Sequence, residues 1–452
     1  MIPGSEQIET IVLKKITPSL EEKKQIEDVI KSLKTVVTSE IKKTKIPIEI
    51  ELVGSSAKDT FIRTSLDIDL FLLFPPAVPR EILEENGLAI GRAILEEQEE
   101  CYAEHPYVRG LFKGYKTELV PCYKIEAASQ KLSAVDRTPL HTRYIEEHLK
   151  ESQKKEVRLF KQFLKGIGCY GAEAEIEGFS GYLCEIMVLK YGSFQQLIEQ
   201  VQQWNYGEKL ALDKRAYPDF TTPLIFIDPV DPERNVASAV SNEKFNLLIK
   251  ACQEYKKIPR LSFFFQNTLQ PWSLQDIRKK IDTKEFMGVR FPKPDIIPEN
   301  LYPQIRKSVR AVRELCEQYG FTIVNATFTV EKKNVYIILE PKMRKISKTI
   351  LHTGPPVALK KNADDFLKKW LDNPRTIKKP YEKEKRWYVE IEREFTDMKE
   401  LLEDQVRRLS LGKNIDVDIL KDLTVVDTND LLIENLRFFW TSHLDQRMTW
   451  ER

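Results

Sequence analysis

Apolar residues recur along the first third of the chain at two spacings, one typical of helices and one of strands. Helical spacing predicts a charged amphipathic helix over residues 19–42 and another helix over 80–98. Between them, residues 47–54 form a predicted strand that runs into a Gly-Ser turn, and a second apolar strand carries the sequence Leu-Asp-Ile-Asp-Leu. Two short strands near 107–113 and 115–125 are joined by a Lys-Gly turn. This order predicts an α+β domain with a mixed sheet.

Beyond residue 142 the pattern becomes mostly helical and then mixed. Helices are predicted over four stretches of the middle block, namely 143–166, 180–191, 193–204 and 241–257. From residue 260 onward strands return at 287–291, 321–330 and 335–340, and they alternate with helices near 303–319 and 362–372. A length of 452 residues suits about three domains of ordinary size.

Charge and composition narrow the class of protein. The net charge is only +2, although charged residues make up 31% of the chain. No stretch approaches the roughly 18 to 20 apolar residues of a membrane span, and the first residues lack the layout of a signal peptide. The six cysteines are scattered without metal-ligand spacing, so neither a zinc site nor a disulfide framework is expected. These features favour a cytoplasmic protein that does not enter a membrane.

Two aspartates on the apolar second strand are the first candidate for chemistry. Side chains alternate between the faces of a strand, so Asp67 and Asp69 are expected to point the same way, roughly 6.5 Å apart. Two such carboxylates repel each other unless a cation lies between them, and magnesium with phosphate oxygens is the usual partner. The alternatives are an exposed strand face that happens to carry two acids, and acids that cap neighbouring loops.

Further residues around this pair favour phosphoryl transfer to a nucleotide. Glu118, on a later strand, supplies a third carboxylate, and three carboxylates are sufficient to hold two metal ions. Upstream, the backbone N–H groups of a turn at Gly54 and Ser55 are expected to cradle a triphosphate. Glycine is needed there because a side chain would hold the phosphates away.

A basic segment near the C-terminus is a candidate surface for nucleic acid. Residues 341–393 hold 15 Lys or Arg against 7 Asp or Glu, interleaved with Trp370, Tyr381, Trp387 and Tyr388. Clustered positive charge with aromatic rings suits a phosphate backbone and unstacked bases. The alternative is a solvated surface whose aromatic residues belong to a small core.

Seven further motifs narrow the range of families that the sequence could belong to. They occur in the order YAEHPYVRG, VPCYK, SAVDRTPLH, EVRLFKQFLK, YGAE, GFSGYLCE and DPVDPERNVA. Together with the Gly-Ser turn and the three acids, they resemble the archaeal, class I CCA-adding enzymes of the polymerase-β nucleotidyltransferase superfamily. The resemblance runs along nearly the whole chain. It implies a multidomain α+β protein with a mixed-sheet nucleotidyltransferase head (1–142), a helical neck that recognises the base (143–258), and an α/β body and tail that bind tRNA (259–452).

The resemblance also implies roles for individual residues. Asp67, Asp69 and Glu118 occupy the catalytic, metal-binding positions, which in the family are commonly Glu, Asp and Asp. The residues that match nucleotide-binding positions are Gly54, Ser55, Lys58, Arg137, Thr138, His141, Lys161, Tyr170 and Arg234. Within this set, Arg234 matches the arginine that reads the incoming base. Without the resemblance, His141 reads as a helix cap, Tyr170 as a core aromatic and Arg234 as part of a loop salt bridge.

The activity implied is template-independent addition and repair of the CCA 3′ end of tRNA. CTP and ATP would be the substrates, pyrophosphate the product, and Mg²⁺ the cofactor of a two-metal-ion mechanism. The acceptor stem, T arm and 3′ end of tRNA are the expected contacts, and a homodimer remains open. The alternatives are a poly(A) polymerase-like or other RNA terminal nucleotidyltransferase, and an RNA-binding protein without activity.

Overall fold

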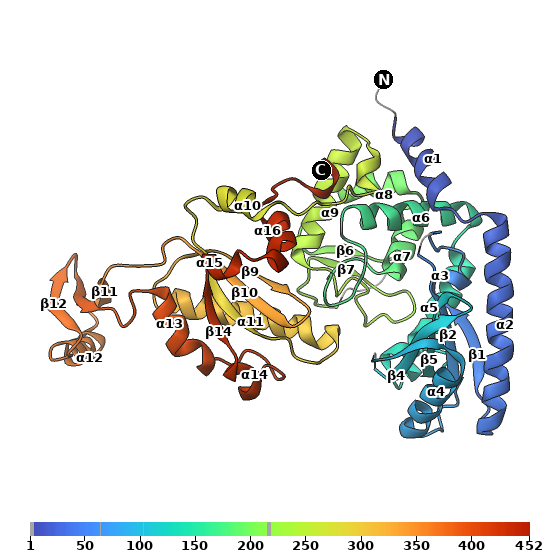
Figure 1. Cartoon of the computed structure of the whole chain (residues 1–452), viewed down its shortest axis with the longest axis horizontal. Helices are drawn as coiled ribbons and strands as arrows, with labels where there is room; N and C mark the ends of the chain where they lie inside the picture. Colours follow the sequence, from blue (N-terminus) through green and yellow to red (C-terminus); the bar gives the residue numbers. More distant parts are fainter. Residues whose placement is uncertain (1–3, 64, 103, 215–217) are drawn as a thin grey trace. The chain divides into compact units, whose positions relative to one another are not determined.

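The chain folds into two compact units (Figure 1). The computed structural model describes residues 4–63, 65–102, 104–214 and 218–452. The first unit comprises Met1–Thr268 together with Arg447–Arg452, and the second comprises Leu269–Gln446. Within the described stretches, no helix has the length and apolar character needed to cross a membrane.

A five-stranded sheet forms the first part of the first unit, with the strand order β1-β2-β5-β4-β3. The strands are β1 (Glu49–Val53), β2 (Ile68–Phe74), β3 (Glu96–Tyr102), β4 (Pro106–Phe112) and β5 (Tyr115–Tyr123). β2 and β5 are parallel, whereas the other neighbours are antiparallel, so the predicted mixed sheet is confirmed. Helices α2 (Leu20–Thr44) and α4 (Arg80–Ile94) share an apolar core with one face of this sheet (Figure 1).

Local sequence explains where α2 begins. The Ser19 hydroxyl accepts the N–H of Glu22 at 3.2 Å, and the Glu22 carboxylate accepts the N–H of Ser19 at 2.7 Å. This reciprocal pair satisfies backbone donors that the first turn of a helix leaves free. Behind it, Ile26, Ile30 and Leu33 are buried at helical spacing, so the helix predicted over 19–42 is confirmed with slightly different ends.

Two of the predicted helices differ from the structure. The helix predicted over 80–98 ends at Ile94, and the next residues form β3 at the edge of the sheet. β3 is acidic and exposed, as edge strands often are, but its pairing partner β4 determines that it is a strand. The helix predicted over 143–166 is two helices, because the backbone at Leu149 and Lys150 is extended.

The remainder of the first unit is mainly helical, as predicted. Its helices are α1 (Ser5–Ile16), α3 (Gly54–Ala57), α5 (Arg137–His148), α6 (Glu151–Gly166), α7 (Gly181–Tyr191), α8 (Phe194–Val201) and α9 (Asn242–Lys257), with a short parallel pair β6 (Glu208–Leu210) and β7 (Leu224–Phe226). Their largest core contains a group of aromatic rings around Phe163. The chain end returns to this core, where Trp450 stacks on Phe263.

The second unit contains two separate sheets. A four-stranded sheet has the order β14-β8-β10-β9, and a three-stranded sheet has the order β11-β13-β12. The strands are β8 (Met287–Pro292), β9 (Ile323–Val330), β10 (Asn334–Pro341), β11 (Thr349–Pro356), β12 (Thr376–Lys383), β13 (Arg386–Glu392) and β14 (Thr424–Asp427). The helices are α10 (Leu274–Ile281), α11 (Pro298–Gln318), α12 (Lys360–Trp370), α13 (Met398–Gln405), α14 (Val417–Lys421), α15 (Thr428–Leu431) and α16 (Arg437–Leu444).

Candidate active site

The turn after β1 brings the backbone of Gly54 against the side chain of Asp69. β1 ends at Val53, and the short helix α3 begins at the next residue. Gly54 has a φ of +72°, and a Cβ atom on it would lie 2.1 Å from Oδ2 of Asp69. Any side chain at this position would therefore collide with the carboxylate, and the backbone conformation itself favours glycine. The N–H of Gly54 donates to the Thr142 hydroxyl at 3.4 Å.

Asp69 and Glu118 lie opposite each other on neighbouring strands. They are register partners in the parallel β2–β5 pair. Asp67 is exposed and lies one residue before β2, rather than on the strand as the pattern predicted. Burial, together with the charges of Glu118 and Asp67, raises the pKa of Asp69 to about 7. The three predicted metal ligands therefore concentrate negative charge at the start of β2.

An arginine on β4 engages the third of these carboxylates. Nε of Arg109 donates to Oε1 of Glu118 at 2.7 Å. A surface cavity of about 350 Å³ is lined by both residues and by Asp67. Across the described part of the chain, no group of three or more His, Cys, Asp or Glu is arranged to hold a metal ion.

The chemistry of the three acids nevertheless suits a divalent cation. All their donor atoms are carboxylate oxygens, which hard cations such as Mg²⁺ prefer. The raised pKa of Asp69 reflects burial and charge repulsion that a cation between the carboxylates would relieve. The chemistry of the three carboxylates is therefore compatible with a divalent cation, and their roles as metal ligands stay predictions.

A buried carboxylate on α7 joins two of the predicted nucleotide-binding lysines. Nζ of Lys58 donates to Oε2 of Glu185 at 2.5 Å, and Nζ of Lys161 donates to Oε1 at 3.1 Å. The Thr60 hydroxyl also donates to Oε1, at 2.6 Å. Burial alone would raise the pKa of Glu185, but the two ammonium groups overcome this effect and bring it to about 2. Glu185 is therefore ionised at neutral pH.

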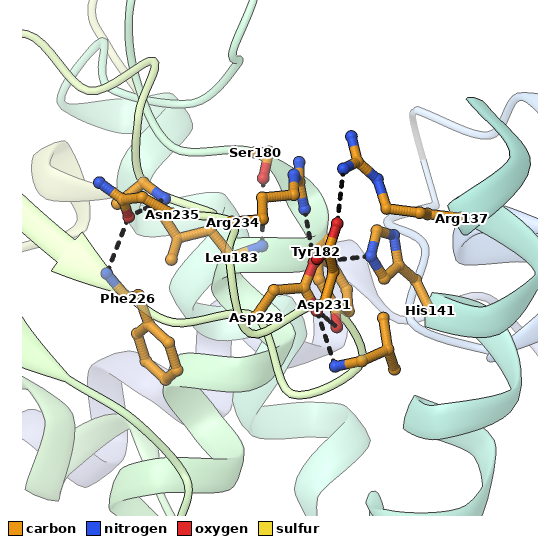
Figure 2. A network of polar contacts seen from close by, with 12 residues as sticks. Arg137, His141, Ser180, Tyr182, Leu183, Phe226, Asp228, Asp231, Arg234 and Asn235 are labelled. Atoms are coloured by element: carbon orange, nitrogen blue, oxygen red, sulfur yellow. Dashed lines mark hydrogen bonds and ion pairs between the residues drawn. The ribbon is translucent and has the colours of Figure 1, made fainter. Parts of the chain in front are cut away.

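A second buried carboxylate, Asp228, gathers side chains from three segments (Figure 2). Its Oδ2 lies 2.8 Å from Nε2 of His141 and accepts NH1 of Arg234 at the same distance. Its Oδ1 accepts the Tyr182 hydroxyl at 3.1 Å. The rings of His141 and Tyr182 stack with their centroids 4.1 Å apart. Burial would raise the pKa of Asp228, but His141 and Arg234 bring it to about 2.

The same loop holds the start of α5 through Asp231. Oδ2 of Asp231 accepts NH1 of Arg137 and Nζ of Lys131, each at 2.8 Å. Arg137 is the first residue of α5, and His141 lies one turn further along this helix. The two aspartates therefore fix the loop to α5 at two points.

The other predicted residues surround these groups without joining them through side chains. The carbonyl of Ser55 accepts the N–H of Thr60 at 3.0 Å, and the carbonyl of Thr138 accepts the Thr142 hydroxyl at 3.1 Å. Tyr170 is half-buried, and Nζ of Lys165 lies 5.2 Å from its ring centroid.

The alternative roles considered for three of these residues have different outcomes. Arg234 does form the loop salt bridge, with Asp228. His141 lies within α5, where its ring contacts Asp228, and it is not a helix cap. Tyr170 packs against the large aromatic-containing core of the first unit, although it is not fully buried.

Six of the predicted residues thus form three groups, all in the first unit. Gly54 lies against Asp69, Lys58 and Lys161 meet at Glu185, and His141 and Arg234 meet at Asp228. The second and third groups approach each other where Nζ of Lys58 lies 6.0 Å from the centroid of the Tyr182 ring.

Sequence reasoning missed the partners that hold these groups together. Glu185 carries a detectable signal, because it is the only acid in the apolar helix GYLCEIMVLKY, and an acid there needs a buried partner. Asp228 and Asp231 lie in a polar loop, and Arg109 lies on a strand near the edge of the sheet, so none of these three carries a comparable signal.

Three family models match successive parts of the chain. They are a nucleotidyltransferase domain over residues 17–141, the second domain of tRNA nucleotidyltransferase over 155–265, and the C-terminal domain of the CCA-adding enzyme over 282–428.

Several relatives match the chain along most of its length. The CCA-adding enzyme of Methanosarcina acetivorans is 34% identical over 94% of this chain and 95% of its own length. The CCA-adding enzyme of Haloarcula marismortui is 35% identical over 91% and 92%, and that of Archaeoglobus fulgidus is 35% identical over 86% and 88%. The chain belongs to the archaeal, class I family of CCA-adding enzymes, the tRNA nucleotidyltransferases.

Proposed function

We propose that this chain builds and repairs the CCA 3′ end of tRNA from CTP and ATP without a nucleic-acid template. The observation that carries the proposal is the close approach of Gly54 to Asp69, with Glu118 in register beside it. This arrangement supplies a triphosphate turn directly next to carboxylates, in a chain that aligns with CCA-adding enzymes over nearly its whole length.

In the proposed reaction, the 3′-hydroxyl of tRNA attacks the α-phosphorus of the bound nucleotide. A new P–O bond forms, the bond to the β-phosphate oxygen breaks, pyrophosphate leaves, and the hydroxyl proton is released. Asp67, Asp69 and Glu118 would hold the divalent cations, for which Mg²⁺ is the proposed identity. Such ions, when bound, neutralise charge on the attacking and leaving oxygens.

The remaining predicted residues would bind and orient the nucleotide. Backbone N–H groups at Gly54 and Ser55, at the start of α3, and the ammonium groups of Lys58 and Lys161 suit the triphosphate, because all of them can donate hydrogen bonds to an anion. Arg137, Thr138, His141 and Tyr170 are proposed for the phosphates and sugar. Arg234 is proposed to read the base, and Asp228 already orients its guanidinium.

The second unit supplies the proposed surface for the tRNA acceptor stem and T arm. The excess of Lys and Arg over 341–393 favours phosphate contacts, which suit recognition of an RNA duplex by shape. The aromatic residues there divide into two kinds. Trp370 is buried in a small core with Trp387 against it, whereas Tyr381 and Tyr388 are half-buried and stack on each other. The homodimer and the cytoplasmic location stay predictions.

The test is a reaction on tRNA that lacks its last three nucleotides, with CTP and ATP supplied together. Addition that stops after C, C and A supports the proposal. Continued incorporation of ATP would instead identify a poly(A) polymerase-like enzyme. Asp69→Ala should abolish incorporation and leave tRNA binding intact, whereas full activity of this variant would remove the three acids from the mechanism.

A further inference from the structure

We propose that Glu185 is a positioning residue that holds Lys58 and Lys161 in place for the triphosphate of the incoming nucleotide. The proposal rests on the proposed function, since it assigns a task to a residue of the same site.

The geometry around Glu185 brings together three distant segments. Lys58 follows α3 directly, Lys161 lies on α6, and Glu185 lies on α7. The exposed fractions of the three side chains are 6%, 2% and 1%. Each lysine binds a different carboxylate oxygen, so neither displaces the other. Thr60 completes the group, since its hydroxyl donates a hydrogen bond to Glu185 and accepts one from Nζ of Lys161 at 3.0 Å.

The balance of charge in this group favours a further anion. Two buried ammonium groups face a single carboxylate, which leaves one positive charge uncompensated within the group, and buried charge is unfavourable without a partner. Burial lowers the pKa of Lys161, and Glu185 opposes that shift. Glu185 therefore helps to keep Lys161 cationic.

The position of the group also suits a triphosphate. Lys58 follows the helix that begins at Gly54, so it belongs to the same turn as the proposed phosphate-binding N–H groups. On the other side, a Cβ atom placed on Gly181 would lie 3.2 Å from the Tyr170 hydroxyl and 3.7 Å from Nζ of Lys161. The Tyr170 hydroxyl and the Lys161 ammonium group, both proposed to contact the nucleotide, thus lie close together beside Gly181.

The decisive variant is Glu185→Gln in the full chain, which keeps the shape of the side chain and removes its charge. Binding of CTP, pyrophosphate and CMP is measured by calorimetry in the presence of magnesium. We expect CTP and pyrophosphate to bind about 10- to 100-fold more weakly, as befits the loss of a charged partner, while CMP binding is unchanged. A residue with only a structural role would not separate CMP from the other two ligands.

Glu254→Gln is the matched control, because Glu254 accepts the indole N–H of Trp450 at 2.6 Å and contacts none of the proposed nucleotide-binding residues. It should leave all three affinities unchanged. Thr60→Val provides a second test if Glu185→Gln does not fold, and it should weaken CTP and pyrophosphate binding at least severalfold.

Two results would overturn the proposal. One is a folded Glu185→Gln protein that binds CTP and pyrophosphate like the wild type, and the other is an equal loss of affinity for all three ligands. Either result leaves the proposed function standing if the wild-type chain adds CCA to tRNA. Failure of the wild type to incorporate CTP would overturn the function itself.

Discussion

Asp228 has one carboxylate oxygen that serves both His141 and Arg234 at 2.8 Å. Because the carboxylate is fully buried and also accepts a hydrogen bond from Tyr182, its orientation is fixed from several directions. The guanidinium of Arg234 is in turn held before any nucleotide arrives, although about a third of this side chain remains exposed. A preorganised arginine loses little further freedom when it meets a base.

Arg234→Ala is expected to lower kcat/KM for CTP and ATP by roughly 10- to 100-fold, the range for a charged hydrogen bond. Discrimination against UTP and GTP should fall at the same time, because the planar donors that would read the base are lost. Incorporation assays with each nucleotide measure both effects. Arg313→Ala, which removes a surface partner of Glu317, is the control and should leave selectivity unchanged. Unaltered selectivity in Arg234→Ala would exclude this residue from base recognition.

Gly54→Ala should reduce turnover on the order of 100-fold, since its Cβ would displace the Asp69 carboxylate by an ångström or more. The matched control is Gly114→Ala, because Gly114 has a similar φ of +80° but open space around the added atom. Both variants carry a similar backbone strain of roughly 1–2 kcal/mol, because positive φ is unfavourable for an L-residue. Steady-state kinetics and thermal unfolding of both variants separate the effect of backbone strain from that of the collision with Asp69. Equal activities of the two variants would contradict the close approach of Gly54 to Asp69.

Helices of the first unit carry several of the proposed site residues and also pack in its core. α6 presents Lys161 on one side and Phe163 to the aromatic core on another. Phe163 contacts several rings, with centroid distances of 5.6 Å to Phe194 and 5.5 Å to Tyr255. This packing gives the helix a rigid support, as close-packed cores do.

Phe163→Ala is expected to lower the free energy of unfolding of the first unit by about 3–5 kcal/mol, because a large cavity would remain in the core. Calorimetric or denaturant unfolding provides the measurement. Phe438→Ala, at a position that is 59% exposed, should change stability by less than about 0.5 kcal/mol. A loss below about 1 kcal/mol in Phe163→Ala would show that the aromatic cluster does not support α6.

Charge is distributed unevenly along a chain that is almost neutral as a whole. The net charge of +2 contrasts with an excess of eight positive residues over 341–393, from 15 Lys or Arg and 7 Asp or Glu in the same range. A local basic surface on a neutral protein orients a polyanion instead of binding it indiscriminately.

Affinity for tRNA should therefore fall at least about tenfold between 50 and 200 mM salt, as phosphate contacts release counterions. A double variant, Lys361→Glu with Lys379→Glu, should weaken binding and reduce this salt dependence. The control reverses the charge of two exposed lysines of α2, Lys31→Glu with Lys42→Glu. It should weaken tRNA binding less. Filter binding at several salt concentrations provides the comparison. Equal effects of the two double variants would mean that 341–393 is not the main tRNA surface.

Most elements of the sheet follow from alternation along short stretches of sequence. β3 is the exception, because the stretch Glu-Glu-Gln-Glu-Glu carries no strand pattern and becomes a strand only through its pairing with β4. The break at Leu149 between α5 and α6 was missed for a related reason, since apolar spacing continues across it. Pairing partners and chain reversals are non-local, and a local pattern does not contain them.

The sequence by itself placed Gly54 at a tight turn and Asp69 at the start of an apolar strand, because these features depend on neighbouring residues. The fold brings Gly54 against Asp69 and sets Glu118 in register beside it, whereas the catalytic roles of these residues stay predictions. Motif order was sufficient to place the family. Tertiary structure alone decided which buried acids hold the basic side chains, since Lys58 and Glu185 are 127 residues apart and meet only in the folded chain. It also tied Glu118 to Arg109. A buried charge requires a partner, but only the packing of distant segments determines which residue that partner is.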